Sequence, residues 1–318
     1  MIARILRLLL ALQLLALAAL WLAFARLGAG PLTAALAALA LLLLLRALIT
    51  AHNFWLGWRG GSATPDAYRP GPAARARLFG GEFAATLLTS SYWMAWPGPR
   101  GRIAAPGRQR GLPVLLIHGY VCNRGYWSGL SRLLARAGIS YAALDLEPPG
   151  ADLDDYVPLV RRALEELCAA SGSAQAIIVA HSMGGLVARA YLRAHGAARV
   201  ARLISVGTPH HGTGLARMAP GRNAWQMRHG GAWLAELAAA EDGPRRALIT
   251  SIFSHHDNIV APQTSAFLPG AKNLAFGAIG HVALGRHPLV LACVMKEIAL
   301  ASAAAAGAPP PQAPPCQP

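Results

Sequence analysis

The first 50 residues carry two long apolar segments, one from Leu8 to Ala25 and one from Leu27 to Leu45. Each approaches the roughly 20 residues that a helix needs to cross a bilayer. The second segment is apolar on all sides, which favours a membrane span over a buried helix of a soluble domain. The pattern predicts a transmembrane hairpin over residues 1–50, with helices at about 5–25 and 30–49. A cleaved signal peptide is the alternative for the first segment.

Arginines mark the two ends of this hairpin. Arg4 and Arg7 precede the first segment, Arg46 and Arg59 follow the second, and Arg26 lies at the tip. Under the positive-inside rule, both ends of the hairpin and the chain that follows face the cytoplasm. If only the first segment crosses the membrane, the rest of the chain lies on the outer side.

After residue 111, short apolar runs alternate with amphipathic stretches. Near-continuous apolar runs predict strands that are buried on both faces. Their alternation with helices predicts an α/β domain over residues 112–300, with a mostly parallel, doubly covered sheet. The predicted strands are Val114–His118, Tyr141–Leu146, Ala176–His181, Leu203–Val206, Leu248–Phe253 and Asn273–Phe276. The predicted helices between them are Trp127–Ala137, Leu153–Ala170 and Leu186–Ala194.

Three stretches depart from this alternation. Residues 51–111 mix Gly, Pro and Arg, and we expect a juxtamembrane linker with a short helix at Glu82–Met94. Residues 213–244 are expected to form one or two amphipathic helices, either a lid or an ordinary crossover helix packed on the sheet. Residues 301–318 are rich in Ala and Pro, which is typical of a disordered tail.

The net charge of the chain is +15, and nearly all of it comes from arginine. A basic face near a bilayer favours anionic head groups, but dispersed and merely solvated arginines explain the composition equally well. The dispersal argues against nucleic-acid binding, and no obligate protein partner is evident. The cysteines lack metal-like spacing, so no metal, cofactor or disulfide is expected. They are Cys122, Cys168, Cys293 and Cys316.

The stretch Ile177–Val187 has the pattern of a buried strand, a tight turn that carries Ser182, and a helix. The residues two positions on either side of the serine are Ala180 and Gly184. A serine at a sharp strand-to-helix corner needs small neighbours there, because the two backbones approach closely. The pattern Ala-x-Ser-x-Gly differs from the nucleophile-elbow motif by one alanine, and it predicts a nucleophilic serine.

Another apolar run, Leu112–Ile117, ends in His118 and Gly119. In acyl-transfer hydrolases, the loop after such a strand donates one backbone N–H to the oxyanion, and the residue after the nucleophile donates a second. The expected donors here are the N–H groups of Tyr120 and Met183.

A general base and its acid are expected downstream of the serine. Asp257 follows a predicted strand in a polar loop, and His281 follows the last predicted strand. Three other acids occupy a stretch that we expect to be helical and solvated, and they are weaker candidates: Glu236, Glu241 and Asp242. The rival base is His287, but it precedes Pro288 at a helix start, where a structural role is expected. The remaining histidines of this region, His210, His211, His255 and His256, are expected at the rim of the site.

The region from about Pro113 to about Ala299 resembles the α/β-hydrolase superfamily, and more narrowly bacterial lipases and esterases. The resemblance implies that Ser182 is the nucleophile, His281 the general base and Asp257 its orienting acid. The motifs that carry it are, in chain order, His118-Gly119-Tyr120, His181 to Gly185, Gly207-Thr208-Pro209-His210-His211-Gly212, Ser254 to Asp257, and Gly280-His281.

These features predict a membrane-anchored serine hydrolase that cleaves carboxylic esters of apolar acyl chains. The expected location is the bacterial inner membrane, with the catalytic domain on the cytoplasmic side, and the expected substrate is a lipid or another acyl ester. This fold hosts many chemistries. An acyltransferase or thioesterase with the same three residues is therefore an alternative, and a catalytically silent binding module is another.

Overall fold

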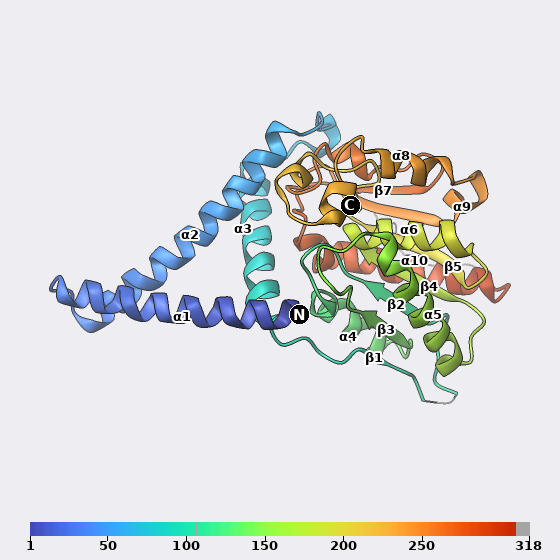
Figure 1. Cartoon of the computed structure of the whole chain (residues 1–318), viewed down its shortest axis with the longest axis horizontal. Helices are drawn as coiled ribbons and strands as arrows, with labels where there is room; N and C mark the ends of the chain where they lie inside the picture. The colour runs from blue at the N-terminus through green and yellow to red at the C-terminus, as the bar shows by residue number, and fades with distance from the viewer. Residues whose placement is uncertain (106, 310–318) are drawn as a thin grey trace.

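A mostly parallel sheet forms the centre of the computed structural model, which describes residues 1–105 and 107–309 (Figure 1). In this part of the chain the strand order is β1-β3-β2-β4-β5-β6-β7, and only β1 runs antiparallel to its neighbour. This confirms the predicted α/β class. The strands are β1 (Gly101–Arg102), β2 (Val114–Ile117), β3 (Tyr141–Leu144), β4 (Ala176–His181), β5 (Val200–Val206), β6 (Ile249–Ser254) and β7 (Lys272–Phe276).

Helices cover both faces of this sheet. Every residue of β2, β4 and β6 is buried, as expected for parallel strands with helices on each side. One core cluster lies under α5 (Val157–Ser171), α6 (Met183–His195) and α8 (Ala232–Ala239). The second cluster lies under α4 (Ser128–Arg136) and α10 (Pro288–Ala305). The sheet therefore lies between two apolar layers.

The N-terminal region forms a long helical hairpin that projects from this domain (Figure 1). Its arms are α1 (Ile2–Arg26) and α2 (Pro31–Arg59), both long and apolar enough to cross a membrane and both largely uncovered by the rest of the protein. A third helix, α3 (Pro72–Leu88), lies between the hairpin and the domain. The helix α10 is also long and apolar, but it packs on the sheet and belongs to the core.

Several predicted boundaries are corrected by the structure. The second hairpin helix continues past residue 49 to Arg59, because its polar His and Asn residues end the apolar run without breaking the helix, which stops only at Gly60. The short helix predicted at Glu82–Met94 is instead α3 followed by a π-helical turn, η2 (Thr89–Trp93). The first five residues of the predicted tail, 301–305, complete α10. Residues 310–318, including Cys316, lie outside the described residues.

The segment 213–244 contains η5 (Gly214–Met218), α7 (Arg222–Gln226) and α8, and α9 (Gly243–Ala247) begins at its end. Apolar residues of α8 join the core cluster under α5 and α6. At its other end the segment borders the loop after β2, since the hydroxyl of Tyr120 donates to the carbonyl of Pro220 at 2.5 Å. A lid and an ordinary crossover segment both stay predictions for these residues.

Candidate active site

Ser182 occupies the sharp corner between β4 and α6, with backbone angles φ 53° and ψ −126°. A non-glycine residue holds this conformation only where the surroundings enforce it. Two glycines make the corner possible. A Cβ on Gly184 would lie 2.5 Å from the carbonyl oxygen of His118, and a Cβ on Gly185 would lie 2.1 Å from Oγ1 of Thr208. The close approach of the β2 loop and of Thr208 therefore explains the small residues after the serine.

The structure brings together the serine, the histidine and the aspartate that the sequence singles out. Nδ1 of His281 lies 2.7 Å from Oδ2 of Asp257, and Nε2 of His281 lies 3.0 Å from Oγ of Ser182. All three side chains are buried, with exposed fractions of 5%, 3% and 8% in the order His281, Asp257, Ser182. Because the carboxylate is an obligate acceptor, Nδ1 carries the proton and Nε2 is free to accept the serine proton.

The acid is held by its own loop. Oδ1 of Asp257 accepts hydrogen bonds from the backbone N–H groups of Ile259 and Val260, each at 2.8 Å. This leaves Oδ2 for the imidazole. The neighbouring Asn258 fixes the base from another side, because its Oδ1 accepts from the backbone N–H of His281 at 2.9 Å. The orientation of the histidine ring is thus set before any substrate binds.

The pKa of His281 is raised above its ordinary value. Burial alone lowers the pKa of this imidazole, but the negative charge of Asp257 and the hydrogen bond to it outweigh burial, and Glu82 adds to the increase. The neighbouring His181 shows the opposite result, since burial and the nearby His281 lower its pKa well below the ordinary value. His181 is therefore neutral near pH 7, and His281 is the stronger base of the two.

The two expected oxyanion donors flank the serine. Gly119 lies so close that a Cβ there would be 2.9 Å from Cβ of Ser182, which brings the adjacent Tyr120 backbone to the serine. Met183 is the first residue of α6, so its N–H points out of the helix end and adds to the positive end of the helix dipole. His118 braces this loop by accepting from the N–H of Leu146 at 2.9 Å.

The alternative acids and the alternative base lie at other places in the structure. His287 is the N-cap residue of α10. Asp242 caps α9 by accepting from the N–H of Arg245, and Glu236 is exposed on α8. The expectation that Glu241 is solvated is wrong, because it forms a buried bidentate ion pair with Arg189, with contacts of 2.6 and 2.7 Å.

The two histidine pairs, His210-His211 and His255-His256, do not all lie at the rim of the site. His210 is buried and bonds to Arg189, Ser205 and Ser251, so for this residue the expectation of a rim position is wrong. His256 lies in the loop after β6 and accepts from the N–H of Ala278. Among residues 1–105 and 107–309, no group of three or more His, Cys, Asp or Glu side chains is arranged to hold a metal ion.

Sequence reasoning missed Glu82, a carboxylate on α3 with an exposed fraction of 1%. Its two oxygens accept hydrogen bonds from the backbone N–H groups of Val282, at 3.0 Å, and Ala283, at 2.9 Å. Burial raises the pKa of Glu82, partly offset by these two bonds. The available signal was its isolation, because it is the one acidic residue within the sequence of α3.

The end of the hairpin also touches the site. Gly57 of α2 lies against the backbone of Asn258, where a Cβ would come within 3.0 Å. Nε2 of Gln263 donates both to the carbonyl of Gly57, at 3.3 Å, and to that of Asp257, at 2.9 Å. A cavity of about 230 Å³ lies beside this contact, with walls from α2, α3 and the acid loop. The helices outside the α/β domain therefore support both loops that carry the acid and the base.

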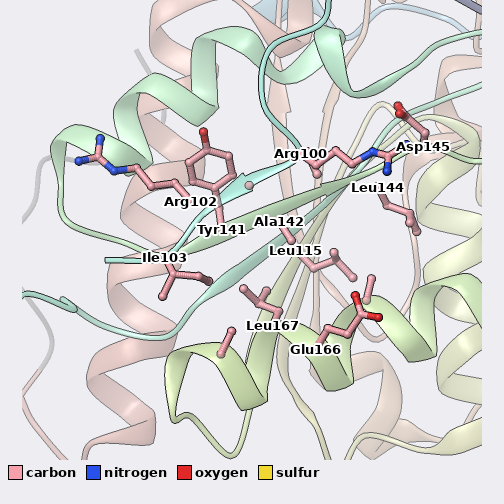
Figure 2. Close-up of a pocket in the computed structure, with 14 residues that line it drawn as sticks. Arg100, Arg102, Ile103, Leu115, Tyr141, Ala142, Leu144, Asp145, Glu166 and Leu167 are labelled. Atoms are coloured by element: carbon pink, nitrogen blue, oxygen red, sulfur yellow. The ribbon is translucent and has the colours of Figure 1, made fainter. Parts of the chain in front are cut away.

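A different cavity, of about 530 Å³, lies at the β1 edge of the sheet. Figure 2 shows its wall, with Arg100 and Arg102 from the edge strand region, Tyr141 from β3, and Glu166 from α5. None of the predicted catalytic residues lines it. Ser182, Asp257 and His281 lie instead after the carboxyl ends of β4, β6 and β7, the side of an open α/β sheet where ligands bind.

Comparison with known proteins agrees with this architecture. A family model described as the alpha/beta hydrolase fold matches residues 113–229. The mature lipase BlEst2 of Bacillus licheniformis is similar in structure, with a TM-score of 0.55 and 20% identity over 63% of this chain and 96% of that one. Lipase B of Aspergillus fumigatus gives a TM-score of 0.54 and 21% identity over 65% of this chain and 60% of that one. This chain therefore has the α/β-hydrolase fold, preceded by two long apolar helices.

Proposed function

We propose that this protein is a membrane-anchored serine hydrolase that cleaves carboxylic esters. The observation that carries the proposal is the unbroken hydrogen-bonded chain from Ser182 through His281 to Asp257, buried at the carboxyl edge of the sheet. A serine hydroxyl is a weak nucleophile until a base removes its proton. A histidine whose second nitrogen is bound to a carboxylate supplies such a base.

In the first half of the reaction, Oγ of Ser182 attacks the ester carbonyl carbon while Nε2 of His281 accepts its proton. The carbonyl π electrons move to oxygen and form a tetrahedral oxyanion. Collapse of this intermediate expels the alcohol, which takes the proton from His281, and leaves an acyl ester on Ser182. Water then attacks this ester with His281 again as the base, and the free acid and the hydroxyl of Ser182 are formed.

The N–H groups of Tyr120 and Met183 are the proposed donors to the oxyanion. Their support is the position of Gly119 against Ser182 and the start of α6 at Met183. Removal of one such donor typically costs about 3 kcal/mol of transition-state stabilisation. The rigid sheet and the close-packed glycines hold both donors in place, so little reorganisation is needed during the reaction.

The hairpin α1–α2 is the proposed membrane anchor, and Arg4, Arg7 and Arg59 at its base favour the cytoplasmic face of a bacterial inner membrane for the catalytic domain. The contacts of α2 and α3 with the acid and base loops support an active site near the bilayer, where an apolar acyl ester would be the substrate. Full-length protein is expected in the membrane pellet after a carbonate wash, and its release into the supernatant would refute the anchor.

The activity is tested by labelling the purified full-length protein with a fluorophosphonate, beside the variant Ser182→Ala. Turnover of p-nitrophenyl esters of several chain lengths is measured in parallel. Labelling and turnover in the parent, both lost in the variant, are expected. A folded parent that neither reacts with the probe nor hydrolyses any ester would overturn the proposal. The matched control is Ser128→Ala, a serine at the start of α4 that lies outside the site.

A further inference from the structure

A cavity of about 300 Å³ lies between α1, α2 and α3, the three helices that outline a triangle in Figure 1. Most of its wall is aliphatic or aromatic, with Leu9 from α1, Leu42 from α2 and Phe83 from α3 as examples. Phe83 follows Glu82 directly, so one wall of the cavity belongs to the helix that braces the base loop. The cavity is distinct from the site of Ser182, which does not line it.

One charged side chain reaches this apolar space. Nη2 of Arg46 donates to Oε1 of Gln13 at 2.6 Å, and Nη1 donates to Oγ of Ser90 at 3.3 Å. Both partners are neutral. Among the described residues that line the cavity, Arg46 is the one with a charge, and no carboxylate accompanies it. Arg46 is half-buried by the protein, and a cation that the bilayer also covers is costly unless an anion joins it.

The depth of Arg46 in the hairpin increases this cost. It lies 15 positions after Pro31, the first residue of α2, which corresponds to about 22 Å along the helix axis. The hydrocarbon core of a bilayer is about 30 Å thick. With the tip of the hairpin at the far surface, Arg46 lies inside the near edge of the core, where charged side chains mark functional sites.

We infer that this cavity binds a single-chain fatty acid, with its carboxylate on the guanidinium of Arg46 and its chain among the leucines. Arginine and carboxylate match as a planar bidentate pair. The cavity is at the lower end of the roughly 300–1,000 Å³ range of ligand pockets, which suits one acyl chain better than the two of a phospholipid. A fatty acid is the acid product of the proposed ester hydrolysis, and the inference rests on that function for the source of its ligand.

The test uses full-length protein that carries Ser182→Ala, reconstituted in phosphatidylcholine nanodiscs, so that binding is measured without turnover. The probe is palmitate with a photoreactive diazirine, and labelled peptides are identified by mass spectrometry. We expect labelling of α1, α2 and α3 that unlabelled palmitate displaces. Arg46→Gln is expected to weaken this binding at least tenfold. Arg59→Gln, at the exposed end of the same helix, is the matched control and is expected to bind as the parent does.

A second variant, Leu9→Trp, keeps the arginine and fills the cavity, and we expect it to weaken binding as well. Thermal unfolding midpoints show whether each variant is folded. Parent-like labelling in folded Arg46→Gln would overturn the inference. Displacement of the probe by phosphatidylglycerol but not by palmitate would overturn it too, by assigning the cavity to a phospholipid. This assay measures binding and not ester turnover. Failure of the proposed hydrolase activity in the separate turnover assay would therefore leave the binding result unchanged.

Discussion

Glu82 accepts a hydrogen bond of 3.0 Å from the backbone N–H of Val282, the residue that follows the proposed general base His281. The contact joins α3 to the loop that carries the proposed base, and both lie outside residues 113–229, which match the α/β-hydrolase family model. A carboxylate that accepts two successive backbone N–H groups fixes the path of that loop. Its charge also raises the pKa of His281.

Glu82→Gln is expected to move the acidic limb of the pH profile of kcat/KM to lower pH and to reduce the rate about tenfold. The amide retains one acceptor oxygen but removes the negative charge that favours protonated His281, and it loses one charge-assisted bond worth about 1.5–3 kcal/mol. The measurement is hydrolysis of a soluble short-chain ester across the pH range. Glu165→Gln, at an exposed i,i+4 pair with Arg161, is the control. A pH profile identical to that of the parent would show that the charge of Glu82 does not act on His281.

Gly280→Ala tests the same contact from the other side. A Cβ on Gly280 would lie 2.6 Å from Oε2 of Glu82, so the alanine must displace the carboxylate or the loop. We expect Gly280→Ala to reduce activity strongly in the parent protein. In a Glu82→Ala background the carboxylate that the new Cβ would meet is gone, and the same substitution should reduce activity much less. A double-mutant cycle on kcat/KM measures this coupling. Strictly additive effects of the two substitutions would contradict it.

The fold and the three central residues were accessible from the sequence for a common reason. The buried strand β4 leaves an apolar run directly before Ser182, and Asp257 and His281 each follow a short strand, β6 and β7, within a few residues. The corner at Ser182 also needs small residues after the serine, and these can be read directly from the sequence. At these places the neighbouring residues in the sequence determine the position in the fold, so the local pattern is sufficient to predict the site residues.

The missed features depend on pairings between distant segments. Glu82 and Val282 are 200 positions apart, and an acid within a helix has the pattern of an exposed residue until its partners are known. Glu241 looked solvated for the same reason, since its partner Arg189 is 52 positions away. The end of α2 was also obscured, because the polar residues His52 and Asn53 interrupt the apolar run, whereas the helix continues past them to Arg59.

The activity of the parent is expected to fall as the pH is lowered through the pKa of His281. Only neutral imidazole can accept the proton of Ser182, and the Asp257 charge raises this pKa, so the acidic limb should lie above the ordinary histidine value of about 6.5. Asp257→Asn should lower kcat by about 10⁴-fold, as the equivalent change does in other Ser-His-Asp sites. It should also move the acidic limb of the pH profile below 6.5, because without the Asp257 charge the effect of burial, which lowers the pKa of His281, is the larger one. An acidic limb unchanged by this substitution would assign the titration to another group.

Glu241→Gln is expected to destabilise the folded protein by about 3–5 kcal/mol without changing the chemistry at Ser182. The substitution leaves the guanidinium of Arg189 buried without its bidentate carboxylate, and an uncompensated buried charge carries a penalty of about this size. Arg189 also contacts the side chain and carbonyl of His210, so the loop after β5 should loosen with it. The measurement is the shift of the thermal unfolding midpoint in detergent, with Glu236→Gln on the exposed face of α8 as the control. Equal midpoints for the two variants would show that the ion pair contributes little. Replacement of both partners by apolar residues should recover part of the loss, because it removes the orphaned charge as well as the bond.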